Sequence, residues 1–154
     1  MRAAVRGYRA VELDAEIAGV RAVLEAAGVR CEADDPPPGL PSEVGAVLAW
    51  VIREGATNVI KHSEARRCSI VLTVYGRSVV LEMRNDGVRA RGTEPAGSGL
   101  TGLEERAAVL GGEITAGRHG RDGFLLRAVV PLPAGDGAAA GPADETVPAG
   151  GRER

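Results

Sequence analysis

The chain has 154 residues, a hydrophobic fraction of 44% with only 3% aromatic residues, and a formal net charge of −2. This length allows one domain with an aliphatic core, and the charge gives no electrostatic basis for a nucleic-acid partner. The longest apolar run, residues 46–52, is far below the roughly 20 residues that a membrane span needs, and no signal peptide is visible. We therefore expect a cytoplasmic chain without direct membrane contact. Cys31 and Cys68 lack metal-type spacing and are expected to be buried or half-buried thiols.

An amphipathic helix and a short strand are predicted after the basic first residues. The helix covers residues 13–27 and ends at Gly28. A short edge strand over residues 29–33 follows it. The apolar positions of the helix recur at helical spacing and are Ile17, Val20, Val23 and Leu24.

A second, longer helix is predicted over residues 42–63. The three consecutive prolines within residues 34–41 exclude a helix interior and indicate a loop. Ser42 follows this loop and is expected to cap the helix.

The long helix has a polar stripe on its core-facing side. At 100° per residue, one sector contains the apolar residues Val44, Leu48, Val51, Gly55 and Val59. The same calculation places four polar side chains inside or beside this sector: Glu54, Asn58, Lys61 and His62. A buried amide or carboxylate without partners costs about 1–3 kcal/mol, so either the protein or a ligand must supply those partners.

The second half of the chain is predicted to contain two β-hairpins separated by a helix. The expected segments are strands at 68–75 and 79–85, a loop at 86–99, a helix at 100–110, and strands at 113–118 and 124–131. After residue 133 the composition indicates a disordered tail, residues 134–154. The element order predicts an α/β sandwich, in which one mixed sheet of about five strands is covered on one face by three helices.

Two further polar clusters lie at the two ends of the predicted loop 86–99. The first is Asn85-Asp86-Gly87, and strand alternation places Asn85 on the helix-covered face and Asp86 on the opposite one. The second cluster opens the third helix, where glycines allow a ligand to approach the backbone and free N–H groups attract anions. Its members are Gly97, Ser98, Gly99, Leu100, Thr101 and Gly102.

Together the three clusters predict a nucleotide site with magnesium. The amide carbonyl of Asn58 suits a hard cation, and Lys61 suits phosphate. Each piece alone has a plainer explanation, since a GxG before a helix is more often a turn and His62 alone is more often a core or capping histidine. The ordered combination carries the prediction.

These residues resemble the motifs of the ATP-binding catalytic domain of sensor histidine kinases. The stretch from Glu54 through Asn58 to Lys61-His62 is similar to their N box, and Asn85-Asp86-Gly87 to their first glycine box. The second glycine box is similar to the stretch from Gly97 to Arg106. The resemblance covers residues 13–133 and is greatest to the DesK-like subclass, which pairs with NarL-type response regulators. It implies the Bergerat fold, with ATP between helices and sheet under a lid.

The resemblance also implies roles for individual residues. Asn58 would ligate Mg²⁺, Lys61 and His62 would lie near the phosphates, and Glu54 would orient or polarise groups during transfer, so that Glu54 and His62 are the catalytic candidates. Asn85, Asp86 and Gly87 would lie beside the adenine base of ATP. The phosphate and lid-hinge residues would be Gly97, Ser98, Gly99, Leu100, Thr101 and Gly102, and residues 86–96 would form the lid.

The chain departs from the family pattern at residues that are expected to lie near the adenine base. Asn85 stands where the usual first residue is aspartate, Arg89 replaces the second glycine, and Phe124 replaces a common threonine. An asparagine can still accept from the adenine amine through its carbonyl.

The family's dimerisation segment, which bears the phosphoacceptor histidine and follows membrane helices, has no match in this sequence. The two histidines are His62 and His119, and residues 1–12 resemble the last turns of that segment. The parent kinase is therefore expected to be membrane-anchored, with this chain as its catalytic domain. Two alternatives stay open: an anti-sigma-factor-type serine kinase, and a non-catalytic module of the same fold with degenerate nucleotide binding.

Overall fold

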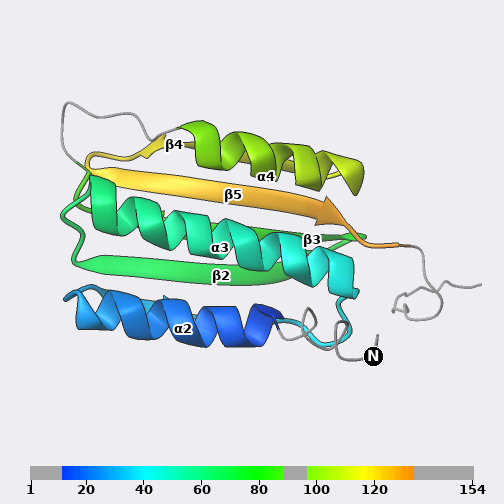
Figure 1. Cartoon of the computed structure of the whole chain (residues 1–154), viewed down its shortest axis with the longest axis horizontal. Coiled ribbons are helices and arrows are strands. Elements are labelled where there is room, and N and C mark those ends of the chain that lie inside the picture. Colours follow the sequence, from blue (N-terminus) through cyan, green and yellow to red (C-terminus); the bar gives the residue numbers. More distant parts are fainter. Residues whose placement is uncertain (1–11, 89–96, 134–154) are drawn as a thin grey trace, which may run out of the picture.

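The computed structural model describes residues 12–88 and 97–133, and the expectations for residues 1–11, for most of the lid and for the tail lie outside these ranges. The described elements are α2 (Glu12–Ala26), β1 (Arg30–Ala33), α3 (Ser42–His62), β2 (Arg67–Tyr75), β3 (Ser78–Asn85), α4 (Gly97–Val109), β4 (Glu113–His119) and β5 (Gly123–Pro131) (Figure 1). Most observed ends differ from the predicted ones by one or two residues, which is the usual uncertainty of helix and strand ends.

The strands form one mixed sheet in the order β1-β2-β3-β5-β4. β1 pairs parallel with β2, and the other pairs are antiparallel. The helices α2, α3 and α4 lie in one layer on the same face of this sheet (Figure 1). The predicted α/β sandwich, with five strands and three helices on one face, is therefore confirmed for the described part of the chain. Across residues 12–88 and 97–133, none of the helices has the length and apolarity to cross a membrane.

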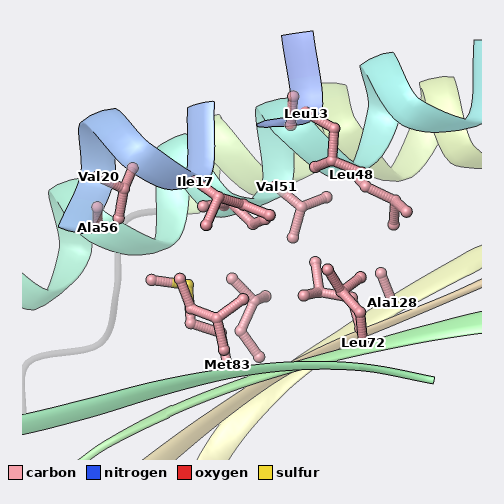
Figure 2. Packing of buried hydrophobic residues seen from close by; sticks show 14 of the residues in the cluster. Leu13, Ile17, Val20, Leu48, Val51, Ala56, Leu72, Met83 and Ala128 are labelled. Carbon is pink, nitrogen blue, oxygen red and sulfur yellow. The ribbon is translucent and has the colours of Figure 1, made fainter. Parts of the chain in front are cut away.

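The core lies between the helix layer and the sheet. Figure 2 shows side chains of α2 and α3 pointing towards side chains of the sheet, and Leu24, Leu48 and Leu81 are completely buried. Val23, which the helical spacing groups with Ile17, Val20 and Leu24, does not belong to this core, because it is 52% exposed. The buried positions of α2 recur at intervals of three and four residues, and Val23 lies about 100° away from Leu24 around the helix.

The start of α3 differs from the prediction that Ser42 caps it. Pro41 is the N-cap residue, with φ −60 and ψ 146, and no side chain donates or accepts a capping hydrogen bond there. The first helical bond runs from the amide N of Gly45 to the carbonyl O of Pro41, at 2.9 Å. The proline ring already holds the φ that this position needs, so Ser42 becomes the first helical residue.

Helix α4 begins at Gly97, three residues before the predicted start. Two glycines in a first turn disfavour a helix by about 1 kcal/mol each, which explains the prediction of a loop there. Packing of the following residues outweighs this preference, because Leu103 and Ala107 are buried and Leu100 packs against the core.

Gly55 brings α3 close to the sheet, and this contact yields a testable prediction. A Cβ at Gly55 would lie 2.5 Å from Met83 Sδ and 3.0 Å from Leu126 Cδ2. We expect Gly55→Ala to destabilise the fold by about 1–2 kcal/mol, because overpacking outweighs the gain in helix propensity. Urea unfolding measures this change. The control is Gly45→Ala in the same helix, where the nearest atom is 4.0 Å away; it should raise stability, and equal effects would contradict the packing explanation.

Candidate functional site

The three polar clusters converge at one end of the molecule. α3 ends where β3 ends, and α4 starts at that same end and runs back antiparallel to α3 (Figure 1). The N-box residues lie in the last turns of α3, Asn85 is the last residue of β3, and Gly97 is the first residue of α4. The fold thus places the three predicted motifs at one end of the helix layer.

Trp50 shows which side of α3 faces α4. The Arg106 guanidinium of α4 lies 5.8 Å from the centroid of the Trp50 ring. Glu54 and Asn58 follow Trp50 at intervals of four residues and lie progressively closer to the core-facing side of α3. Because the helices are antiparallel, the turns of α3 that carry Glu54 and Asn58 lie towards the end of the layer at which α4 begins (Figure 1).

Asn58 has a buried polar atom without a partner. Among the described residues, its Nδ2 is the one buried side-chain nitrogen or oxygen that forms no hydrogen bond. Such a group destabilises the folded protein by about 1–3 kcal/mol. The two ends of a carboxamide have nearly the same shape, so rotation of the side chain would present Oδ1 at this position. A ligand that bonds to this amide would remove the cost.

The other N-box residues range from half-buried to exposed. Glu54 and His62 are half-buried, as Asn58 is, and Lys61 is exposed. Within residues 12–88 and 97–133, none of the side chains of Glu54, Lys61 and His62 forms a hydrogen bond or an ion pair with another described residue. All three are available to a ligand.

Asn85 lies on the helix-covered face, as strand alternation predicts. Its register partners are Cys68 on β2 and Phe124 on β5, so the three side chains form a row beneath the helices. Asn85 Nδ2 donates a hydrogen bond of 2.8 Å to the carbonyl O of Asp86. The N–H₂ end of this amide is therefore committed to the backbone.

Asp86 lies on the opposite face and has a backbone-holding role that sequence reasoning missed. Its Oδ1 accepts hydrogen bonds from the backbone amides of Arg66 (2.7 Å) and Arg67 (3.0 Å). Partial burial alone would raise the pKa of Asp86, but these hydrogen bonds outweigh it and hold the pKa below its ordinary value of 3.8. Asp86 thereby ties the start of β2 to the end of β3. Contact with a base remains a prediction for this residue.

The depressed pKa of Asp86 predicts a pH dependence of stability. A carboxyl whose pKa is lower in the folded state contributes stability above its unfolded pKa and loses it as the pH falls through the folded pKa. We expect Asp86→Asn to be less stable than wild type at neutral pH, with the difference shrinking below about pH 4. Urea unfolding at several pH values tests this, and a difference that does not change with pH would contradict it.

The segment after Asp86 is held against the β4–β5 turn. The amide N of Val88 donates to the carbonyl O of Asp122 at 2.9 Å, and the amide N of Gly87 donates to Asp122 Oδ2 at 3.4 Å. On its other side, the carbonyl O of Gly87 accepts from the amide N of Glu64 at 2.9 Å. The start of the predicted lid is therefore anchored on both sides. No local sequence signal identifies Asp122 as part of this arrangement.

The first turn of α4 supplies backbone N–H groups at the same end of the helix layer as Asn58 (Figure 1). Gly97 to Gly102 all belong to the helix, so the first N–H groups of this stretch have no partner within the helix. Gly102 has no protein atom within 4 Å of the place that a Cβ would take. Packing among the described residues therefore does not require glycine at this position, unlike at Gly55. Leu100 is half-buried and Thr101 is exposed.

Cys31 and Cys68 are both buried, as expected, and they are register partners on β1 and β2. A hydrogen bond that the Cys68 thiol donates to the Cys31 sulfur, together with burial, raises the pKa of Cys68 far above its ordinary value. Within the described residues, no group of three or more His, Cys, Asp or Glu side chains could hold a metal ion.

Comparison with known proteins gives sequence relatives of one kind, although no family model matches the chain. Sensor histidine kinase YvfT of Bacillus subtilis is 28% identical over 134 residues, which are 86% of this chain and 36% of that protein. Sensor histidine kinase DesK of the same organism is 28% identical over 119 residues, 74% of this chain and 32% of that protein. The chain thus spans about a third of the length of these curated relatives.

Solved structures with the same fold are also histidine kinases. The histidine kinase domain of the blue-light-activated kinase EL346 from Erythrobacter litoralis matches with a TM-score of 0.59 and 16% identity, over 75% of this chain and 57% of that one. The Acinetobacter baumannii histidine kinase AdeS matches with a TM-score of 0.59 and 15% identity, over 79% and 66%. Relatives and fold together confirm the resemblance carried by the motifs: this chain is similar to the ATP-binding catalytic domain of sensor histidine kinases, in the DesK-like subclass.

Proposed function

We propose that this chain is the catalytic domain of a two-component sensor histidine kinase, which binds Mg²⁺–ATP at the end of the helix layer. The observation that carries the proposal is the buried Nδ2 of Asn58, which has no hydrogen-bond partner and lies in the last turns of α3, at the end of the helix layer where α4 begins. The γ-phosphoryl group would pass to a histidine on a dimerisation segment and then to a response regulator of the NarL type. The domain would act in the cytoplasm, and its parent kinase would be membrane-anchored.

The donor set fits a magnesium ion that arrives with the nucleotide. Mg²⁺ keeps several waters and is commonly bound by one or two protein groups together with substrate phosphates. Asn58 would supply the amide oxygen of this set. When bound, the ion neutralises charge on the phosphates during transfer. The same rotation of the Asn58 amide that presents its oxygen to a ligand would remove the buried N–H₂ without a partner.

Base recognition is assigned to Asn85 and its row on the sheet. Because Asn85 Nδ2 is committed to the carbonyl of Asp86, its Oδ1 is the end that would accept from the adenine amine. Phe124 pairs with Asn85 in register and offers an aromatic side chain beside the base. Gly87 and Asp86 would hold this edge of the pocket in place through their backbone contacts.

Phosphate binding and transfer are assigned to α3 and the start of α4. Lys61 would contribute positive charge, and the N–H groups of the first turn of α4 would bind phosphate oxygens at the positive end of the helix. The α4 residues concerned are Gly97, Ser98, Gly99, Leu100, Thr101 and Gly102. Glu54 and His62 would orient the acceptor histidine and the γ-phosphate, and phosphoryl transfer depends mainly on such positioning.

Phosphoryl transfer to an acceptor supplied in trans tests the proposal. The intact chain is mixed with a dimerisation segment that bears the acceptor histidine, Mg²⁺ and γ-labelled ATP. We expect acid-labile, base-stable label on the segment, lost when its histidine is replaced by glutamine and when Asn58→Ala is used. An unlabelled segment beside a folded, ATP-binding chain would contradict the kinase assignment, and label on serine would favour the serine-kinase alternative.

A further inference from the structure

A basic hollow lies at the edge of the sheet, where Asn85 and Asp86, assigned above to the base pocket, also contribute to its lining. Its volume is about 440 Å³, and it is formed by the ends of β1, β2 and β3 and by the β4–β5 turn. The lining includes the four arginines Arg30, Arg67, Arg84 and Arg121. We refer to this depression, defined by those four arginines, as the basic hollow.

Strand alternation places Arg84 of the basic hollow on the side opposite the helices. Val79, Leu81 and Met83 of β3 are buried beneath the helices, so Arg84 points to the other face. Arg84 is the register partner of Ser69, which also lines the hollow. Asn58 and α4 lie on the helix side of the sheet, whereas Asn85 and Asp86 of the proposed base pocket also line the hollow.

The arginines of the hollow are placed in a way that is unfavourable without a ligand. Arg30 and Arg67 are direct register partners on the parallel strands β1 and β2, and like charges directly opposite each other destabilise a sheet. Neither of these arginines nor Arg121 forms an ion pair with another residue of the described ranges. Arg84 is different, because its Nη2 lies 3.2 Å from Glu82 Oε1.

The carboxylates of the hollow do not fully offset this charge. Three carboxylates also line it: those of Glu32, Asp86 and Asp122. Asp86 accepts two backbone amide hydrogen bonds, and Asp122 accepts one from the amide N of Gly87. These hydrogen bonds do not remove the charge of either carboxylate, and the positive charge of Arg67 helps to lower the pKa of Asp86. Four guanidinium groups against three carboxylates leave the lining with a formal excess of one positive charge.

We propose that the basic hollow is a binding site for a small molecule that carries a phosphate or diphosphate group. A guanidinium bonds phosphate oxygens in pairs through its planar fork, and a hollow of this volume is within the range of small-molecule sites. Binding would replace the repulsion between Arg30 and Arg67 with attraction from each to the anion. The proposed anion contacts use no residue of the N box or of α4, and Asn85 and Asp86 are the residues that the hollow shares with the proposed base pocket.

Titration of the intact chain with inorganic phosphate and with pyrophosphate tests the proposal. Calorimetry at low ionic strength should show binding, tighter for pyrophosphate, with the affinity falling as salt is added. We expect the double variant Arg30→Gln/Arg67→Gln to weaken pyrophosphate binding at least about tenfold. It should fold as stably as wild type or more so when no anion is present, because it removes a like-charge pair.

Two controls separate this site from the rest of the surface and from the nucleotide site. Arg127→Gln changes an arginine that pairs with Glu82 on the same face but does not line the hollow, and it should leave pyrophosphate binding unchanged. Asn58→Ala should also leave it unchanged. Unaltered affinity in the double variant, loss of affinity in Asn58→Ala, or no binding to the wild type would each overturn the proposal. If the double variant fails to fold, Arg121→Gln in the exposed turn supplies the same test.

Discussion

Asn58→Ala should abolish or strongly weaken Mg²⁺–ATP binding while leaving the fold at least as stable as wild type. The amide is buried and its Nδ2 has no partner, so its removal relieves a desolvation cost instead of breaking a bond. The same change removes the proposed magnesium ligand. Calorimetric titration should show at least about a tenfold loss of affinity, equivalent to about 1.4 kcal/mol, and urea unfolding should show unchanged or increased stability.

The neighbouring residue supplies a matched control for this experiment. Thr57 Oγ1 donates to the carbonyl O of Arg53 within the same helix, at 3.1 Å, so Thr57→Ala should leave ATP affinity unchanged. A parallel titration with Mg²⁺–GTP tests the base pocket, since the Asn85 carbonyl should favour adenine. ATP affinity that survives in Asn58→Ala would contradict the proposed role. Absence of binding in the folded wild type would favour a non-catalytic interaction module.

Gly87→Ala should be the most destabilising alanine substitution among the glycines of the motifs that the structure describes. Gly87 has φ +79, and a Cβ there would lie 2.5 Å from the carbonyl C and O of Glu64 and 2.6 Å from the amide N of Ala65. These are backbone atoms, so a side-chain rotation cannot relieve the overlap. We expect a loss of at least about 3 kcal/mol in the free energy of unfolding, or failure to fold.

Gly39→Ala separates the two causes of this loss. Gly39 has the same φ, +79, but no atom lies within 4 Å of its Cβ position. It should lose only the cost of the left-handed conformation, about 1–2 kcal/mol. Denaturant unfolding of both variants, with m-values compared, measures the difference. Similar losses for Gly39→Ala and Gly87→Ala would show that backbone conformation, and not the contact with Glu64 and Ala65, makes Gly87 necessary.

The helices and strands, and the face to which their side chains point, were predictable because both follow from local periodicity. Alternation along β3 correctly placed Asn85 beneath the helices and Asp86 on the opposite face. The apolar residues of the predicted α3 sector are all buried, but the buried face is wider than that sector and also includes Val47, Ala49, Ile52 and Ala56. Local rules failed where packing outweighed propensity. The two glycines at the start of α4 are helical, and Val23 is exposed because the buried stripe of α2 is narrower than its apolar content suggests.

The connections around the site could not be predicted, because they join residues far apart in the sequence. Asp86 accepts hydrogen bonds from backbone amides about twenty residues earlier in the chain. The carbonyl O of Asp122 accepts one from the amide N of Val88. Neither contact has a local pattern that distinguishes it from an ordinary turn. The orphan amide of Asn58 is likewise a property of its three-dimensional surroundings. The helical pattern predicted that it needs a partner, and the structure shows that the described protein does not provide one.

The position of Trp50 has a practical consequence for studying this chain. It is the single tryptophan of the sequence, it is 44% exposed, and its ring lies near Arg53 on α3 and Arg106 on α4. Its intrinsic fluorescence therefore comes from one place at the junction of the two helices. A shift of α4 relative to α3 would change the environment of the indole and its emission. The chain thus carries a native optical reporter of helix movement and needs no attached dye.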